Sequence, residues 1–285
     1  MKLSILIVAY DCSMENSATL TSILASKLGF DGARLCFWNN GPHYMSPLPG
    51  TLAALAERSL EVSIRQTCQN APLSWIYNYF IKNFPGDRYV ILDHDSILSN
   101  EYLQHILARK KTFLGMPTIL VEGEPQYPRS NRRFSLGPYT NRDDVFSIGS
   151  GLLLSHEATR CIENAYGNIF DDNFALYGVD ISLFKRIQKL GFTEKLESLP
   201  GFEHSLSRLK SETKELKHFR RVEKSYYFGL MLRHYPSARR LRILLKQLLR
   251  LPLGRNKLLF RKALKAFLTG RHERCGLPPL EKLIH

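Results

Sequence analysis

The stretch VILDHDSIL, residues 90–98, decides the fold. Tyr89 and the apolar residues Val90, Ile91 and Leu92 form an uninterrupted run, which is typical of a strand that is buried on both faces of a parallel sheet. The run ends at two carboxylates, Asp93 and Asp95, which flank His94. The sequence therefore predicts a buried strand whose carboxyl end is strongly polar.

Two carboxylates at the end of a buried strand need a partner. Burying a charge without one costs several kcal/mol per ion. Mg²⁺ or Mn²⁺ would provide a partner, because such an ion binds one or two carboxylates and fills its other positions with water and substrate phosphates. Asp93 and Asp95 are therefore candidate metal ligands at a site that holds a diphosphate.

Strands and helices alternate on either side of this stretch. The expected strands cover 3–10, 33–40, 60–66 and 88–95, and the expected helices cover 17–28, 52–58 and 73–83. This alternation predicts an α/β fold with a Rossmann-like, mainly parallel sheet flanked by helices. Ligands of such sheets bind outside the carboxyl ends of the strands.

Polar residues follow three of the expected strands and should meet at one edge of the sheet. Any one such group is ordinary turn chemistry, because Asp, Asn and Gly often end strands. All three groups together favour a binding site. The groups are Ala9, Tyr10 and Asp11, then Asn39, Asn40 and Gly41, then Asp93, His94 and Asp95.

The positive charge lies in one part of the chain. The 285 residues have a formal net charge of +14, yet residues 205–285 contain 21 Lys or Arg and only 5 Glu. A boundary near residue 205 is therefore expected, with an α/β domain at 1–204 and a basic helical extension at 205–285.

The extension contains two amphipathic segments. Leu241, Leu244, Leu245 and Leu248 recur at helical spacing within ARRLRILLKQLLRL, and LLFRKALKAFL repeats the pattern with Phe260, Ala263, Leu264 and Phe267. One interpretation is that 236–285 binds an anionic membrane, which we favour because leucines and basic residues occur together. The alternative interpretation is that the apolar faces pack on the domain at 1–204 or in a homodimer. The first predicts a cytoplasmic protein, peripheral on the inner face of the cytoplasmic membrane.

Several classes of protein are disfavoured by what the sequence lacks. No stretch approaches the roughly 20 apolar residues of a membrane span. The extension has no zinc spacing and no RNP signature, so no nucleic-acid partner is expected. The five cysteines are far apart and lack metal-ligand spacing, which favours reduced thiols.

A set of motifs in a fixed order resembles glycosyltransferase family 2, the inverting enzymes of the GT-A fold, and especially its bacterial rhamnosyltransferase-like members. The match covers roughly 3–205 and consists of SILIVAYD, NNGP, NAPLSWIYN, ILDHDS, SIGSGLLLSHEA and FDDNFALYGVDISLFKRIQKLGF. The resemblance implies transfer of a sugar from a nucleoside-diphosphate donor, dTDP-rhamnose or a UDP-hexose, to a surface-glycan or lipid-linked saccharide.

The resemblance also assigns roles to residues on the donor side. It implies a divalent cation, Mg²⁺ or Mn²⁺, bound by Asp93, Asp95 and His204, although His204 alone could equally be structural. Asn39 stands where the family usually has an aspartate that binds the base. The residues implied to bind the nucleotide-sugar are Ala9, Tyr10, Asp11, Asn39, Asn40, Gly41, Asn70, Asn78, Asp93 and His94.

On the acceptor side the resemblance implies that Asp180 is the general base that deprotonates the acceptor hydroxyl. Val179 replaces the glutamate of the family's ED pair, and the alternative role of Asp180 is a first-turn acid of a helix that begins there. Asp171, Asp172, Gly149 and Gly151 are further acceptor-side candidates. The segment 122–144 has no apolar period and is expected to be a mobile lid, in which Arg132 and Arg133 contact phosphate or remain solvated.

Two other functions remain open. A nucleotidyltransferase also pairs acids on a Rossmann-like sheet, but it should have a Gly-rich basic loop after the first strand, and YDCSMENSA has none. A catalytically inactive relative that binds sugar nucleotides or membrane would account for the departures at Asn39 and Val179.

Overall fold

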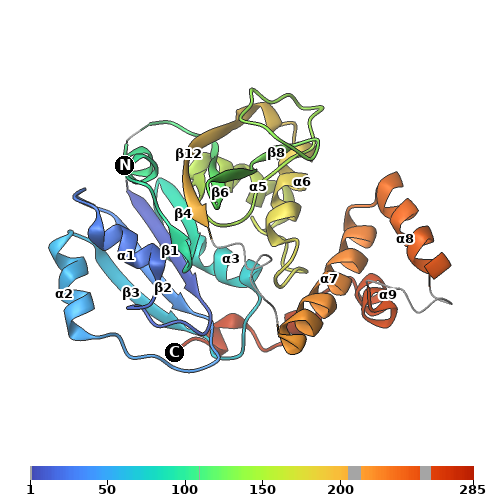
Figure 1. Cartoon of the computed structure of the whole chain (residues 1–285), viewed down its shortest axis with the longest axis horizontal. Coiled ribbons are helices and arrows are strands. Elements are labelled where there is room, and N and C mark those ends of the chain that lie inside the picture. Colours follow the sequence, from blue (N-terminus) through green and yellow to red (C-terminus); the bar gives the residue numbers. More distant parts are fainter. Residues whose placement is uncertain (1, 109, 205–212, 251–257) are drawn as a thin grey trace.

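One large mixed sheet organises the protein (Figure 1). The computed structural model describes residues 2–108, 110–204, 213–250 and 258–285. Four neighbouring parallel strands form the first half of the sheet, in the order β3 (Glu61–Gln66), β2 (Arg34–Asn39), β1 (Leu3–Ala9) and β4 (Arg88–Asp93). These are the four strands expected from the sequence, so the mainly parallel α/β architecture is confirmed.

The second half of the sheet is mixed. Beyond β4 the order is β11 (Leu152–Ser155), β6 (Leu114–Val121), β12 (Leu196–His204) and β5 (Ser96–Ile97), while β7 (Glu124–Tyr127) pairs with β6. The short strand β11 runs antiparallel to both of its neighbours, and β12 runs parallel to β6. β5 follows β4 after a two-residue turn and pairs antiparallel with β12, so the residues after Asp93 cross to the far edge of the sheet.

Helices cover both faces of the sheet. Apolar residues of α1 (Ala18–Ala25), α2 (Pro49–Glu57) and α4 (Asn100–Leu107) join one core, and those of α3 (Leu73–Asn83), α5 (His156–Tyr166) and α6 (Val179–Lys189) join the other. Because side chains alternate along a strand, Ile5 and Ile7 of β1 face the first core, and Leu6 and Val8 face the second. A 3₁₀ turn, Thr193–Lys195, leads from α6 into β12.

Residues 122–144 are not the structureless loop that their composition suggested. β7, β8 (Arg129–Ser130) and β9 (Arg133–Phe134) lie within them, and β8 pairs with both β9 and β10 (Val145–Phe146) in a small second sheet. Asn131 and Asp144 are joined by main-chain and side-chain hydrogen bonds, and Lys185 of α6 contacts Asp144 at 2.5 Å. Such strands are too short to leave a periodic apolar pattern.

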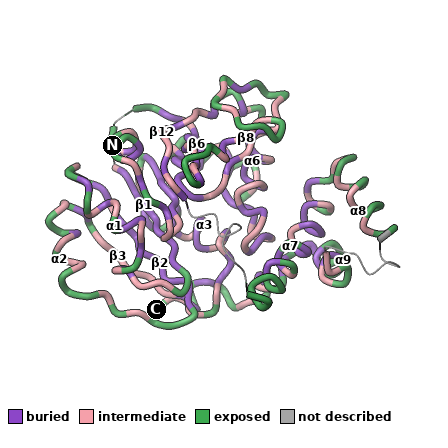
Figure 2. The backbone as a smooth tube through the Cα atoms, in the orientation of Figure 1, coloured by how far each residue is buried: buried purple, intermediate pink, exposed green. Residues whose placement is uncertain are grey.

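The basic extension forms three helices and then returns to the sheet. α7 (Lys214–His234) crosses α9 (Phe260–Thr269) so closely that a Cβ on Gly229 would lie 2.1 Å from the carbonyl oxygen of Ala263. α8 (Ala238–Arg250) extends outward and its residues are mostly exposed (Figure 2). The expected boundary near residue 205 falls in 205–212, outside the described residues.

The last residues pack against the first half of the sheet. Two short 3₁₀ helices, Glu273–Gly276 and Leu280–Lys282, follow α9. His285 then pairs with Gln66 through two main-chain hydrogen bonds, and its ring lies edge-on to Tyr44. Tyr226 and Leu230 of α7, with Leu280, belong to the same core as α3 and α6. The extension therefore shares a core with the sheet domain. Within the described part of the chain, no helix is both long and apolar enough to cross a membrane.

Candidate functional site

The turn after β4 is fixed by the start of α1. The backbone oxygen of His94 accepts hydrogen bonds from Ser17 Oγ at 3.0 Å and Thr19 N at 3.2 Å, and the hydroxyl of Thr19 bonds to the backbone oxygens of Asp93 and Ser96. The chain therefore leaves the strand in one defined direction, with Asp93 and Asp95 on either side of the turn.

The three sequence-predicted metal ligands lie together. One ligand atom from each of Asp93, Asp95 and His204 lies within 4.8 Å of the others. His204 Nε2 is 3.8 Å from Asp93 Oδ2, and His204 Nδ1 is 3.6 Å from Asp95 Oδ1. Ligands about 2.1 Å from an octahedral ion lie roughly 3 to 4 Å apart. The group therefore fits a divalent cation after small side-chain rotations.

The ring of His204 is oriented by a neighbour that the motifs do not include. Ser96 Oγ lies 3.0 Å from His204 Nδ1, and 2.9 Å from Ser150 Oγ. Ser150 Oγ also accepts a hydrogen bond from the backbone N–H of Asp93. A hydroxyl that engages Nδ1 leaves Nε2 available as a ligand, which is the usual arrangement around metal-binding histidines.

The electrostatics of the group favour a cation. Burial, together with the charge of Asp95, raises the pKa of Asp93 to about 7, and His94 opposes the shift. Burial also lowers the pKa of His204 and so keeps its ring neutral, although Asp95 opposes this effect. A bound cation would favour the ionised form of Asp93 and would still accept a neutral imidazole.

The two predicted donor-binding segments that follow β1 and β2 are hydrogen-bonded to each other, and the loop after β3 packs against them. Asn40 N donates to Ala9 O, and Asp11 N donates to Gly41 O, both at 2.7 Å. A Cβ on Gly41, whose φ is +98°, would lie 2.6 Å from the carbonyl oxygen of Cys68, so only glycine fits this turn. The carboxyl ends of β1, β2 and β3 therefore form one continuous edge.

Asn39 and Asn40 hold this edge together with their side chains. Asn39 Nδ2 donates to His43 O and to Gln66 Oε1, while its Oδ1 accepts from Gly41 N. Asn40 Oδ1 accepts from Thr67 and from Ala71 N, and its Nδ2 donates to Ala71 O. Both side chains are 2% exposed. Both amide hydrogens of Asn39 are thus donated within the protein, and its expected contact with a base, which its Oδ1 would make by accepting, stays a prediction.

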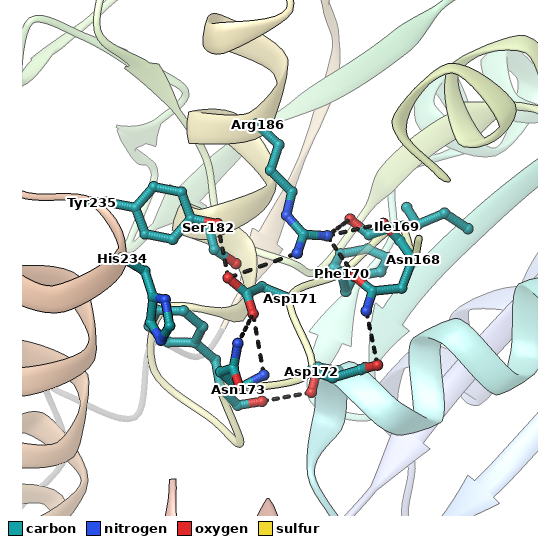
Figure 3. A network of polar contacts seen from close by, with 12 residues as sticks. Asn168, Ile169, Phe170, Asp171, Asp172, Asn173, Ser182, Arg186, His234 and Tyr235 are labelled. Carbon is teal, nitrogen blue, oxygen red and sulfur yellow. Dashed lines mark hydrogen bonds and ion pairs between the residues drawn. The ribbon is translucent and has the colours of Figure 1, made fainter. Parts of the chain in front are cut away.

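Asn78 and Asp171 likewise have partners within the protein. Asn78 Nδ2 donates to Phe170 O and Asp172 Oδ1, and its Oδ1 accepts from Phe170 N. Asp171, 5% exposed, accepts from Tyr235 and Asn173 and lies 3.7 Å from Arg186 (Figure 3). These contacts fix the loop before α6 against α3 and α7. Asn78 and Asp171 therefore have structural partners, and their roles as donor and acceptor contacts stay predictions.

The carboxylate of Asp172 has different hydrogen-bond partners from that of Asp171. Its carboxylate accepts from Asn78 Nδ2 at 2.6 Å and from Asn168 Nδ2 at 2.9 Å. Burial raises the pKa of Asp172, and the hydrogen bond from Asn78 opposes the shift. It remains an acceptor-side candidate on the same loop.

Asp180 lies in the first turn of α6, where the sequence placed it. Its Oδ1 accepts from Ile181 N at 2.7 Å. Burial raises the pKa of Tyr77 well above its ordinary value, and the charges of Asp93 and Asp180 raise it further. The charges of the candidate metal ligand Asp93 and the candidate base Asp180 therefore both act on one buried hydroxyl from α3. Tyr77 has no signal in the sequence beyond its place in a buried helix.

The remaining acceptor-side candidates divide into packed and exposed residues. Gly151 has a φ of +85°, and a Cβ there would lie 2.5 Å from Pro117, so packing accounts for this glycine. Gly149 lies beside the Tyr77 hydroxyl, 3.6 Å from where its Cβ would be. Arg132 and Arg133 are exposed at the β8–β9 turn of the small second sheet.

Comparison with known proteins identifies the fold. Neither a protein-family model nor a curated protein sequence matches the chain. Among solved structures, TarS of S. aureus aligns over 96% of this chain and 50% of its own, with a TM-score of 0.55 and 13% identity. TarS 1–349 in complex with UDP-GlcNAc aligns over 96% of this chain and 83% of its own, with a TM-score of 0.52 and 14% identity.

A third structure, TarS 1–349 in complex with UDP, has a TM-score of 0.53 at 15% identity and covers 96% of this chain and 82% of its own. The chain thus spans about half the length of full TarS. At such low identity the similarity shows the fold, which is GT-A-like, with helices following the sheet domain. It does not distinguish rhamnosyltransferases from other members.

Proposed function

We propose that the protein is an inverting glycosyltransferase that moves a sugar from a nucleoside-diphosphate donor to a hydroxyl of a glycan or lipid-linked saccharide. The observation that supports it most is the convergence of Asp93, Asp95 and His204 beside the edge formed by β1, β2 and β3. A GT-A-like fold puts a metal-bound diphosphate and its nucleoside at such an edge.

In this proposal Asp93, Asp95 and His204 hold a divalent cation, which when bound neutralises the charge of the departing nucleoside diphosphate. An imidazole suits the hard Mg²⁺ less well than a transition metal, so Mn²⁺ is the first candidate. Thr19, Ser96 and Ser150 keep the ligands in place.

Asp180 is proposed to take the proton of the acceptor hydroxyl. Its charge and that of Asp93 both act on the buried hydroxyl of Tyr77, which supports a base and a metal-bound leaving group that serve one substrate. A single base without an enzymic nucleophile gives inversion, through a transition state like that of glycoside hydrolysis. Arg132 and Arg133 are proposed to meet the substrate only when the 122–144 segment approaches it.

The donor is proposed to be a UDP-hexose or dTDP-rhamnose. TarS 1–349 has been solved with UDP-GlcNAc, which places UDP sugars first among the donors to be tested. The motif resemblance places dTDP-rhamnose beside them. Tyr10 and Asp11, both exposed at the end of β1, remain the candidates for nucleoside contact.

The extension is proposed to bind the anionic cytoplasmic face of a membrane, which would bring the site to a lipid-linked acceptor. On α8, Leu241, Leu245 and Leu249 are exposed by 51%, 60% and 78% and form one stripe flanked by basic residues. On α9, Ala263 packs against α7 while Phe260, Leu264, Phe267 and Leu268 remain exposed.

The test of the proposed reaction is a panel of sugar nucleotides, assayed with Mn²⁺ for release of the nucleoside diphosphate. We expect release from one donor, enhanced by an acceptor and abolished in Asp95→Ala. Formation of a sugar nucleotide from a nucleoside triphosphate would show a nucleotidyltransferase instead. Binding of nucleotide without any turnover would show an inactive relative.

A further inference from the structure

Arg274, in the segment that returns from the extension, reaches the loop after β3. Its Nη1 donates to Asn70 Oδ1 at 2.7 Å and to Asn70 O at 3.1 Å. The two residues are 204 positions apart. One guanidinium nitrogen thus bonds both oxygens of a single asparagine and fixes the backbone and the side chain together.

The position of Arg274 is fixed in turn by a buried group on α7. Arg274 Nη2 lies 2.9 Å from Glu223 Oε2, and His272 Nε2 lies 3.3 Å from the same oxygen. His272 Nδ1 accepts a hydrogen bond from Arg274 N, so the ring proton is on Nε2 and faces Glu223. Glu223 and His272 are each 4% exposed. The buried carboxylate of Glu223, which both residues contact, holds the guanidinium of Arg274 in place.

Asn70 needs this support because its conformation is unfavourable. Its φ is +52°, in the left-handed region that asparagine tolerates and most residues avoid. Its Oδ1 is also 3.4 Å from Asn40 Nδ2 at the edge where β1 and β2 end. With both oxygens engaged, the side-chain amide group Nδ2 is the part of Asn70 left to donate a hydrogen bond.

Asn70 differs in this respect from the other asparagines of the edge. Asn39 and Asn78 each donate both amide hydrogens within the protein, whereas no hydrogen bond from Asn70 Nδ2 is found in the described residues. Asn70 is also only partly buried. Among these three side chains, Asn70 is the one whose donor group is available to a ligand.

We propose that Arg274 is a positioning residue for the nucleotide of the donor: by fixing both oxygens of Asn70, it presents Nδ2 of Asn70 to the nucleoside diphosphate. The inference rests on the proposed function and extends it, because it makes the basic extension a part of the donor site. The extension would then contribute to donor affinity independently of any membrane.

The experiment measures the dissociation constants of UDP, GDP and dTDP, each with Mn²⁺, by calorimetry on the full chain. For a nucleotide that the wild type binds, Arg274→Ala should bind about tenfold more weakly, since the hydrogen bond that Asn70 Nδ2 would no longer present to the charged diphosphate contributes at least that factor. Arg271→Ala, an exposed arginine nearby, is the matched control and should bind as the wild type does.

Two readouts separate positioning from a general structural effect. Binding of Mn²⁺ alone should be unchanged in Arg274→Ala, because no metal-ligand candidate contacts Arg274. Asn70→Ala should lose the same factor, and the double variant should lose no more than either single variant. If Arg274→Ala does not fold, Arg274→Lys serves in the cycle, because a lysine cannot reproduce the forked contact.

The outcomes are distinguishable. If the wild type binds none of the three nucleotides, the proposed function fails and the inference fails with it. If the wild type binds one of them and Arg274→Ala binds it equally well, only the inference is overturned. A parallel loss of Mn²⁺ binding, or additive losses in the double variant, would also overturn it.

Discussion

Ser96 and His204 face each other across the antiparallel pair β5 and β12, with Ser96 Oγ 3.0 Å from His204 Nδ1. The contact joins the strand that follows the two aspartates to the strand that ends in the histidine. The geometry of the candidate metal site therefore depends on the pairing of β5 with β12, because any shift in this pairing would move His204 away from Asp93 and Asp95.

Removing this contact should weaken metal binding without removing a ligand. Ser96→Ala leaves all three candidate ligands but frees the ring of His204, and loss of such a supporting hydrogen bond typically costs 10- to 100-fold in metal affinity. Titration with Mn²⁺ by calorimetry measures the effect, and Ser99→Ala, a serine that caps α4, is the control. An unchanged affinity in Ser96→Ala would argue against His204 as a ligand.

Metal should stabilise the protein more at high pH than at low pH. The pKa of Asp93 is raised to about 7, above the roughly 3.9 of an unfolded chain, so the folded metal-free protein binds this proton more tightly. The contribution of this proton to the free energy of unfolding is therefore fully present below pH 4 and is lost as the pH rises through 7. Since 38% of the side chain is exposed, water screens part of the repulsion, and we expect a shift of only a few degrees.

Thermal melts at pH 6 and pH 8, with and without Mn²⁺, measure this linkage. The increase in Tm on adding Mn²⁺ should be larger at pH 8, and Asp93→Asn should raise the Tm of the metal-free protein at pH 8 but not at pH 4. Asp31→Asn, which changes an exposed carboxylate, should do neither. Equal increases in Tm at both pH values would contradict the assignment to Asp93.

Asp180→Asn should separate binding from turnover. The amide keeps the shape of the side chain but cannot accept a proton, and loss of a general base typically lowers kcat by about 10²- to 10⁴-fold. Steady-state kinetics with the donor found in the panel give kcat, and calorimetry gives donor affinity, which should not change. Full activity in this variant would remove Asp180 from the role of base.

Asp171 should contribute to stability and not to chemistry. Asp171 and Arg186 form a buried ion pair whose side chains are 6% and 7% exposed, and removing one member of such a pair costs about 3 to 5 kcal/mol. Chemical denaturation of Asp171→Asn gives the loss in unfolding free energy. In the control Glu157→Gln, which breaks the exposed pair with Lys195, the loss should stay below about 1 kcal/mol. A small loss in Asp171→Asn would instead favour its predicted role on the acceptor side.

The stripe on α8 should determine membrane binding. Replacing Leu245 and Leu249 with glutamate adds charge to the apolar face, so co-sedimentation with vesicles that contain phosphatidylglycerol should fall strongly. The same change at Leu48 and Leu136, which are exposed outside the extension, is the control. Binding should also decrease with added salt and be weak to phosphatidylcholine alone. Equal binding by both double variants would refute the role of the stripe.

The sequence predicted the fold well because its signal was local. The apolar runs that become β1 and β4 are uninterrupted, and their polar ends lie where the chain must turn. Asp93, Asp95 and His204 were predicted together, and the structure brings them together. The roles of the asparagines could not be predicted. The side chain of Asn40 donates a hydrogen bond to Ala71, which is 31 residues away in the chain. An asparagine in a sequence can bind either a ligand or the backbone, and the residue type does not show which.

The contacts of the extension with the sheet domain also could not be predicted from the sequence. Its charge separates it from the rest of the chain, yet Arg274 and His285 pack against residues that precede α3. The amino-acid composition of a segment shows its charge, but it does not show which of its side chains pack against other parts of the chain. The helical pattern of α9 shows the same limit, since Ala263 and Ala266 are too small to reveal a packed face.

The pairing of Gln66 with His285 bears on how the chain unfolds. It ties the edge of the first four strands to residues that follow α9, so the extension cannot separate without breaking hydrogen bonds in the sheet domain. The protein should therefore melt in one cooperative transition, seen equally by circular dichroism and by tryptophan fluorescence. What looks in the sequence like an appendage would then be part of a single folding unit.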